Sequence, residues 1–274
     1  MGKLSKRELK GQKEIFELLN SKDKLTFEET ERFYTEANEA FITDITENSQ
    51  YFTGLELAYD FALMSIWKEG VIVDMCAGWG VLSWAAMVRD GYNHDIKKII
   101  CIERDPKFYE IGKKLVQSNE HTEVIWICGD MFDVNLWKQI KQEHGEINCI
   151  YSNPPFGKLS KTSCDRSWLQ YKGSEIEMAA IEIALKNSRH QAFILPSGSC
   201  TFEASTTKAR TFGTHHKENK KVDKLKKDIK KNFYMSWDSV DSSVYDQTFK
   251  NTSVTVECLS ICDVEDISDE TAID

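Results

Sequence analysis

Between residues 71 and 195 the sequence alternates short apolar runs with longer amphipathic segments, and this alternation restricts the fold more than any other feature. Strands made of continuous apolar residues and separated by helices are typical of a parallel sheet that helices cover on both faces. The pattern predicts a doubly wound α/β fold. The expected strands are 71–75, 99–102, 124–128, 147–151 and 192–195, and the expected helices are 55–68, 81–88, 106–118, 134–142 and 175–186.

Two strand-like runs, 232–240 and 253–261, follow the alternating region. They suit a closing pair at the edge of the sheet, which brings the expected total to seven mostly parallel strands. The first fifty residues have helical spacing, with apolar side chains at three- and four-residue intervals. The residues that set this spacing are Phe33, Ala37, Ala40, Phe41 and Ile45.

These patterns divide the chain into three parts. We expect an N-terminal helical extension over residues 1–50 and a main domain over 51–262, with a small C-terminal insertion, rich in lysine, at about 205–232. An acidic tail over 263–274 completes the chain. No repeat and no linker long enough to separate independent domains is visible.

Composition excludes several classes of protein. With 41% hydrophobic residues the chain is unlike disordered sequences. Its apolar runs are far shorter than the roughly 18 to 20 residues that cross a bilayer, and its N-terminus does not resemble a signal peptide. The eight cysteines contain no Cys-x-x-Cys pair, which favours reduced thiols in the cytoplasm over disulfides or zinc. We interpret His215-His216 as surface residues and predict no metal site.

An acid and two glycines follow the first apolar run. Asp74 lies at the end of this run, and Gly78 and Gly80 lie in the loop before the next helix. Ligands bind at the carboxyl ends of strands in a parallel sheet, where glycines let the backbone approach a ligand closely. The loop resembles a nucleotide-binding loop in which Ser83 replaces the third glycine.

Acids also follow the next two strands. Glu103 comes directly after 99–102, and Asp130 follows 124–128. A carboxylate at the position of Glu103 can accept hydrogen bonds from both hydroxyls of a ribose. Each acid alone could be a helix N-cap, the role we expect for Asp105 and Asp133. Three successive strands that end in an acid favour a ligand site.

The segment Asn153-Pro154-Pro155-Phe156 follows the strand 147–151, in a chain with only four prolines. One interpretation is a rigid turn, because two prolines fix φ and prevent a helix. A chemical interpretation is also available. The Asn153 amide oxygen and the Pro154 carbonyl are two fixed acceptors that suit an amino group, and the Phe156 ring can stack on a flat base. The arrangement fits transfer to an exocyclic amine.

Together these residues resemble the class I S-adenosylmethionine-dependent methyltransferases that modify amino groups and carry Asn/Asp-Pro-Pro-aromatic. The likeness is strong over residues 52–196. The segment that begins at Trp168 is similar to one in orphan DNA adenine methyltransferases of phages and mobile elements, which is a less specific match. The resemblance implies S-adenosyl-L-methionine as cofactor and direct displacement at its methyl group, in which positioning replaces a strong base.

The resemblance also implies roles for individual residues. The methionine end of the cofactor would lie at Asp74, Ala77, Gly78 and Gly80, with Glu103 at the ribose. Asp130 would face the adenine amino group, and Arg104 and Met131 would flank the adenine. Phe52 and Thr53 match an element that contacts the methionine moiety, although Gly54 replaces the proline of its commoner form. Asn153, Pro154, Pro155 and Phe156 would form the catalytic turn, with Asn153 also close to the cofactor.

Methylation of the N6 amine of adenine in DNA is the leading hypothesis, with relaxed or short-sequence specificity and with a target base that must be flipped or unpaired. Three alternatives stay open: a ribosomal RNA adenine or guanine amino methyltransferase, a protein glutamine N5-methyltransferase, and a catalytically inactive nucleic-acid-binding subunit. A homodimer or a partner subunit is compatible with each of them.

The net charge of −9 does not exclude a nucleic-acid partner, because charge acts locally. Residues 1–24 carry seven bases and four acids, a charge of +3, and residues 217–231 carry eight lysines and three acids, a charge of +5. We predict that basic residues contact phosphates, with a solvated helix face as the alternative for 217–231. The candidates are Lys158, Lys161, Lys208, Arg210, Lys220, Lys221, Lys224 and Lys227.

Overall fold

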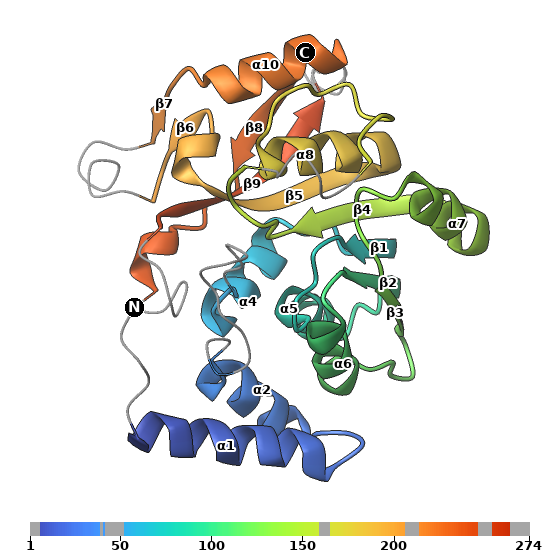
Figure 1. Ribbon diagram of the computed structural model, residues 1–274, viewed down its shortest axis with the longest axis vertical. Helices are drawn as coiled ribbons and strands as arrows, with labels where there is room; N and C mark the ends of the chain where they lie inside the picture. Colours follow the sequence, from blue (N-terminus) through green and yellow to red (C-terminus); the bar gives the residue numbers. More distant parts are fainter. Residues whose placement is uncertain are drawn as a thin grey trace.

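The computed structural model describes residues 6–38, 41, 52–158, 165–205, 214–245 and 254–263. Its centre is a seven-stranded sheet in the order β3-β2-β1-β4-β5-β9-β8 (Figure 1). Neighbours from β3 to β5 pair in parallel, and β9 is antiparallel to both β5 and β8. The strands are β1 (Gly70–Asp74), β2 (Ile96–Glu103), β3 (Glu123–Cys128), β4 (Ile147–Ser152), β5 (Ser188–Pro196), β8 (Phe233–Trp237) and β9 (Val256–Asp263). The predicted doubly wound fold and its closing pair of strands are confirmed.

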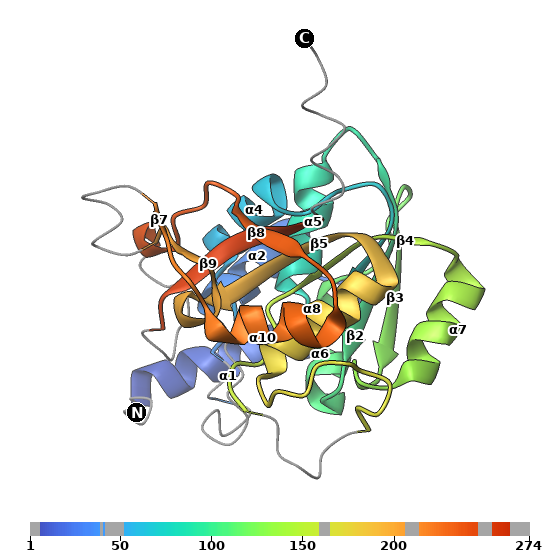
Figure 2. The same cartoon turned by 90° about the horizontal axis from the view of Figure 1, so that it is seen from above.

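Helices cover both faces of the sheet, as Figure 2 shows from above. Successive residues of each strand point to opposite faces, so that Ile72 belongs to one buried cluster and Val73 to the other. Helices α4 (Leu55–Met64), α5 (Val81–Asp90) and α6 (Pro106–Leu115) contribute to the cluster on one face. Helices α7 (Val134–His144), α8 (Ile176–Asn187) and α10 (Lys220–Ile229) contribute to the cluster on the other face.

The N-terminal helices α1 (Lys6–Ser21) and α2 (Phe27–Glu36) join the first cluster through Ile15, Leu19 and Phe33. Thr26 forms a capping box with Glu29 at the start of α2. The predicted helical spacing beyond Phe33 is wrong at Ala37, which is extended with φ −65° and ψ 142° because α2 has ended. Ala40 and Ile45 lie outside the described residues.

Two helices end earlier than their apolar patterns predict. Helix α4 ends at Met64 instead of residue 68, and the Lys68 ammonium donates to the carbonyls of Ala62 and Leu63 in its last turn and of Ile66 beyond it. Helix α6 ends at Leu115 instead of residue 118. The N-termini of α6 and α7 confirm the predicted caps, since Asp105 and Asp133 each accept a hydrogen bond from a backbone N–H two residues on.

The basic insertion contains a two-stranded ribbon and α10. Strand β6 (Phe202–Glu203) pairs with β7 (His215–His216), so the adjacent histidines form part of a strand. Short 3₁₀ turns at Ser197–Ser199 and Ser242–Val244 follow β5 and precede β9. Within the described ranges, no helix has the length and apolar character that crossing a membrane requires.

Candidate functional site

The loop between β1 and α5 lies at the carboxyl end of β1, the middle one of the five parallel strands. Gly78 has φ +55°, and a Cβ atom there would lie 2.8 Å from the Phe52 ring. Its N–H donates to Glu103 Oε2 at 2.8 Å. Gly80 begins α5 with φ +83°, and a Cβ atom there would lie 2.7 Å from Val116. Both positions therefore require glycine, for backbone conformation and for close packing.

Asp74 lies beneath this loop and is fully buried. Its carboxylate accepts a hydrogen bond of 2.8 Å from Ser83 Oγ, which lies 2.9 Å from the Tyr151 hydroxyl. Burial raises the pKa of Asp74 to about 7. Ser83, at the position of the missing third glycine, thus joins the glycine loop to strand β4. Asp74 thus stabilises the loop through Ser83. Gly80 packs closely against Val116, the C-cap of α6, and Trp126 of β3.

Glu103, at the end of β2, accepts backbone hydrogen bonds at both carboxylate oxygens. Gly78 N–H donates to one oxygen at 2.8 Å, and Asp105 N–H donates to the other at 2.7 Å. The side chain is only 6% exposed. Burial raises its pKa to about 7, although the two N–H groups act in the opposite direction.

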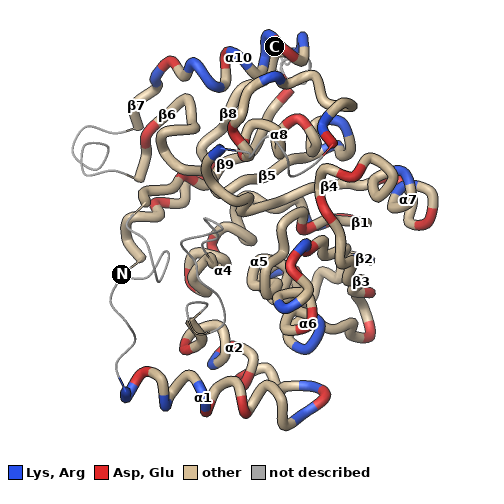
Figure 3. Tube along the Cα trace, viewed as in Figure 1, with Lys and Arg blue, Asp and Glu red and all other residues tan. Residues whose placement is uncertain are grey.

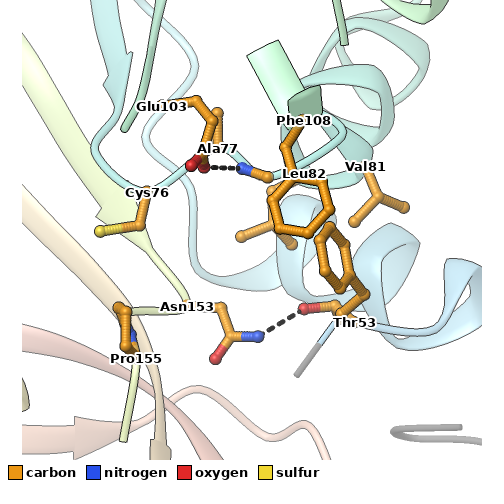
Figure 4. A pocket seen from close by; sticks show the side chains of 11 residues that line it. Thr53, Cys76, Ala77, Val81, Leu82, Glu103, Phe108, Asn153 and Pro155 are labelled. Atoms are coloured by element: carbon orange, nitrogen blue, oxygen red, sulfur yellow. Dashed lines mark hydrogen bonds between the residues drawn. The ribbon is translucent and has the colours of Figure 1, made fainter. Parts of the chain in front are cut away.

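Glu103 lines two pockets, of which Figure 4 shows the first. The first pocket encloses about 490 Å³, part of it open to solvent, and is lined by Phe52, Thr53, Cys76, Ala77, Gly78, Val81, Leu82, Glu103, Phe108, Asn153 and Pro155. The second encloses about 580 Å³ and is lined by Met75, Cys76, Ile102, Glu103, Arg104, Gly129, Asp130, Met131, Phe132, Pro155 and Ile176. Cys76, Glu103 and Pro155 line both. An elongated ligand with hydroxyl donors near its middle fits this pair of pockets.

The second pocket contains the three residues predicted to surround an adenine. Asp130 Oδ1 accepts a hydrogen bond from Phe132 N–H at 3.0 Å, and Arg104 forms an ion pair with Asp130 at 3.6 Å. Met131 is buried, and its carbonyl accepts from Trp137 Nε1. Its sulfur atom lies 3.5 Å from the Cys76 thiol, whose pKa is raised by burial.

The Asn-Pro-Pro-Phe turn is held beside the glycine loop because β4 neighbours β1 in the sheet. Tyr151 pairs with Asp74, and its carbonyl accepts from Met75 N–H at 3.1 Å. Asn153 is half-buried and donates from Nδ2 to Thr53 Oγ1 at 3.0 Å. Residues from the start of α4 and the end of β4 thus meet in one pocket.

The other residues of the turn have different surroundings. Pro154 is buried, Pro155 lines both pockets, and Phe156 is half-buried and packs against the first hydrophobic cluster. Gly157 has φ +117°, and its carbonyl accepts from Ile176 N–H, which ties the exit of the turn to the start of α8.

The predicted phosphate-binding lysines that the structure describes differ in their partners. Lys221 donates to buried Glu177 at 3.3 Å and to Ser199, and Lys224 pairs with Asp228 at 2.9 Å. Lys158 forms a β-bridge with Glu175, and Lys158, Lys220 and Lys227 are exposed. Lys161, Lys208 and Arg210 lie outside the described residues.

Several pocket residues escape prediction from the sequence. Cys76, Val81 and Leu82 are apolar positions of the glycine loop and the first turn of α5, and Ile176 begins α8. Phe108 lies in the first turn of α6, and its ring centroid lies 4.9 Å from that of Phe52. The sequence signal that could have identified Phe108 is an aromatic residue in the first turn of the helix that follows Glu103. Across the described residues, no group of three or more His, Cys, Asp or Glu side chains could hold a metal ion.

The sequence matches no protein-family model and no curated protein sequence. Solved structures do match its fold. A protein assigned as a class I S-adenosylmethionine-dependent methyltransferase from Listeria monocytogenes superposes with a TM-score of 0.52 at 13% identity, over 86% of this chain and 68% of that one.

The methyltransferase subunit of the type I restriction-modification system from Streptococcus thermophilus also gives a TM-score of 0.52, at 12% identity. The match covers 85% of this chain and 49% of that subunit, so the chain spans about half of the subunit's length. Similarity at such low identity shows the fold alone. The chain has the fold of the class I S-adenosylmethionine-dependent methyltransferases.

Proposed function

We propose that this protein transfers a methyl group from S-adenosylmethionine to the exocyclic N6 amine of adenine in DNA. One observation carries the proposal. Asn153 and Pro155, from the turn after β4, line the same pocket as Gly78 and Glu103, from the loops after β1 and β2. Asn153, one of the two acceptors that we propose for an amine, therefore lines the same pocket as a carboxylate and a glycine loop suited to a nucleoside cofactor.

The two pockets would hold the parts of this cofactor in the order that the resemblance implies: methionine, ribose and adenine. The first pocket, at Phe52, Ala77 and Gly78, would hold the methionine end. Glu103, at the junction, would accept hydrogen bonds from the ribose hydroxyls. The second pocket would hold the adenine, with Asp130 at its amino group and Arg104 and Met131 at its faces. When bound, the cofactor supplies the electrophilic methyl group.

The turn after β4 would orient the target amine. The Asn153 amide oxygen and the Pro154 carbonyl accept its two hydrogens, so that the nitrogen lone pair points to the methyl group. Proline fixes the backbone at two successive positions, which keeps the two acceptors in a constant relation. Phe156 would stack on the base. The reaction needs no strong base, because the amine loses its proton after the transfer and positioning supplies most of the acceleration.

A DNA substrate agrees with the resemblance of the sequence and with the restriction-modification subunit that shares the fold. The target adenine would have to leave the duplex to reach a pocket at the strand ends. Exposed lysines, Lys158, Lys220 and Lys227 among them, would contact phosphates. We propose that the target sequence is short or relaxed.

Tritiated methyl transfer to DNA, RNA and protein, measured in parallel and followed by mass spectrometry of the nucleosides, tests the substrate. The expected product is N6-methyladenine in DNA. Label in RNA or on glutamine would contradict the DNA substrate but would still support methyltransferase activity. Failure to bind S-adenosylmethionine in a calorimetric titration would refute the enzyme itself.

Replacement of Asn153 tests the proposed catalytic turn. Asn153→Ala removes one of the two acceptors for the amine, so methyl transfer should be abolished while cofactor binding is mostly kept. Transfer is measured with labelled cofactor and binding by calorimetry. Asn135→Ala, an exposed position on α7, is the matched control and should behave like the wild type. Transfer retained by Asn153→Ala would remove this residue from the mechanism.

A further inference from the structure

We infer that Thr53 is the positioning residue of Asn153: its hydroxyl holds the carboxamide so that the amide oxygen, and not the amide nitrogen, is presented to the target amine. The inference rests on the proposed function. It gives Thr53 a part in the transfer step, whereas the sequence resemblance gave it a contact with the cofactor.

The contact joins two parts of the chain that are 100 residues apart. Asn153 Nδ2 donates to Thr53 Oγ1 at 3.0 Å, and in Figure 4 the amide oxygen points away from Glu103. Thr53 is only 7% exposed. It lies just before the N-cap of α4, where the Gly54 carbonyl accepts from Ala58 N–H at 3.0 Å. The hydroxyl therefore belongs to a buried residue next to the start of α4.

The orientation of the carboxamide decides which chemistry the site can perform. One end of the group donates two hydrogen bonds, and the other end only accepts. With Nδ2 bound to Thr53, the oxygen is the end that can accept from an amine. A reversed carboxamide would place N–H groups against the N–H groups of the substrate, which leaves donors facing donors. A threonine hydroxyl can donate as well as accept, and here it accepts from Nδ2. A contact in this direction favours amines as substrates and aligns the nucleophile.

Thr53 also lines the first pocket, so a role in cofactor binding must be separated from the positioning role. The two roles predict different kinetics. A group that binds only the cofactor changes its Kd and KM, with little effect on kcat at saturation. A group that orients the amine acceptor lowers kcat and leaves the cofactor Kd almost unchanged.

The experiment compares Thr53→Val, which keeps the shape and removes the acceptor, with Thr53→Ser, which restores the hydroxyl. We expect Thr53→Val to lower kcat about 10- to 100-fold, with the cofactor Kd within about twofold of wild type. Thr53→Ser should recover most of kcat. Thr122→Val is the matched control, because Thr122 is also buried and donates to a carbonyl, that of Ile96 at 3.1 Å, but lies at the far edge of the sheet.

A weakened cofactor Kd with unchanged kcat would overturn the inference in favour of a cofactor contact. Unchanged kcat and Kd would overturn it as well. Loss of kcat in Thr53→Val that Thr53→Ser does not recover would also contradict it, since the hydroxyl would then not be the cause. If the wild type transfers no methyl group, the proposed function fails and the inference falls with it, whereas normal transfer by Thr53→Val refutes the inference alone.

Asn153→Asp supplies a second measurement on the same contact. A carboxylate presents an acceptor at both ends, so it has no wrong orientation. The change in log kcat caused by Thr53→Val is therefore compared in two backgrounds, Asn153 and an active Asn153→Asp. In the Asn153→Asp background it should be less than half of the change in the Asn153 background. An equal effect in both backgrounds would contradict orientation of the amide. If Asn153→Asp transfers no methyl group, the comparison of Thr53→Val with Thr53→Ser decides.

Discussion

Asp74 and Glu103 are both buried carboxylates at strand ends, but their partners differ. Asp74 accepts from the Ser83 hydroxyl below the glycine loop, whereas Glu103 accepts from two backbone N–H groups and borders both pockets. Burial raises each pKa to about 7. Only Glu103 is placed to meet a ligand, so its charge should govern binding near neutral pH.

We predict that affinity for S-adenosylmethionine falls as pH decreases below about 7, because protonated Glu103 accepts fewer hydrogen bonds from the ribose. Calorimetric titration between pH 6 and 8 measures the effect. Glu103→Gln should bind more weakly and lose most of the pH dependence. A wild-type affinity that is constant over this range would exclude Glu103 as the titrating group.

In the chain without cofactor, ionisation of Asp74 and Glu103 lowers the stability of the fold, whereas ionisation of Glu103 favours cofactor binding. Their pKa values in the folded chain lie above the ordinary values of 3.8 and 4.5, so the folded state holds more protons than the unfolded state between about pH 4 and 7. Their contribution to the free energy of unfolding is therefore full below about pH 4 and is lost as pH rises through 7. The rise in Tm on adding cofactor should be larger at pH 8 than at pH 6, because the cofactor binds more tightly when Glu103 is ionised.

At the scale of elements, the N-terminal helices hold the glycine loop. Trp79 lies in this loop and is nearly buried. Its carbonyl accepts from the Tyr34 hydroxyl at 2.9 Å, and its ring centroid lies 5.4 Å from that of Phe33 in α2 and 6.1 Å from that of Phe16 in α1. Phe52 packs on the same ring at 4.6 Å. Helices α1 and α2 thus fix the loop that lines the first pocket.

Tyr34→Phe should therefore weaken cofactor binding although Tyr34 lies in a different element from the pocket. Loss of one hydrogen bond to the loop backbone predicts an increase in Kd of about 2- to 10-fold, with the fold intact. Calorimetry measures Kd, and thermal unfolding reports the fold. Tyr92→Phe is the control, because Tyr92 is fully exposed. Equal Kd values for the two variants would show that α1 and α2 do not support the site.

Local patterns predict the elements well but not their contacts. The apolar runs identify β1, β2, β4 and β5 because these strands are buried on both faces, and Glu103 and Asn153 could be found because strand ends meet at one edge. The Lys68 ammonium reaches three carbonyls at and just beyond the end of α4, and no periodicity encodes that contact. The bond between Thr53 and Asn153 likewise exists only after β4 and the start of α4 have come together.

At the scale of the molecule, charge is distributed unevenly, and α10 carries five lysines against two aspartates (Figure 3). The two ends of α10 lie near opposite ends of the strands of the sheet. Asn219, at its start, donates to the carbonyls of Gly198 and Cys200, which follow the carboxyl end of β5. The candidate site lies at the same ends of the parallel strands. Lys231, beyond the end of α10, pairs with Asp263 at the opposite ends of the strands. A bound phosphate backbone would thus contact the start of α10 first.

Replacement of Lys220 and Lys227 by Gln tests this surface. Each lost phosphate contact should reduce the slope of log affinity for DNA against log salt by about 0.9, with kcat at saturating DNA unchanged. Fluorescence anisotropy at several salt concentrations measures the slope. The control pair is Lys97→Gln and Lys138→Gln, exposed residues of β2 and α7. Equal slopes for the two double variants would leave α10 as a solvated helix.

Lys221→Gln should behave differently from both pairs. Its ammonium neutralises Glu177, which is only 2% exposed, so the variant leaves a buried charge without its partner. The expected result is a lower Tm without a change in the salt slope.

The position of β9 has a consequence for how the chain folds during synthesis. Among the strands of the described residues this one is made last, yet it lies between β5 and β8 and pairs with both. Until residue 263 has left the ribosome, β5 is an uncovered edge and β8 has no neighbour in the sheet. The parallel strands from β3 to β5 can assemble earlier, whereas the far side of the sheet must wait for translation of its final strand.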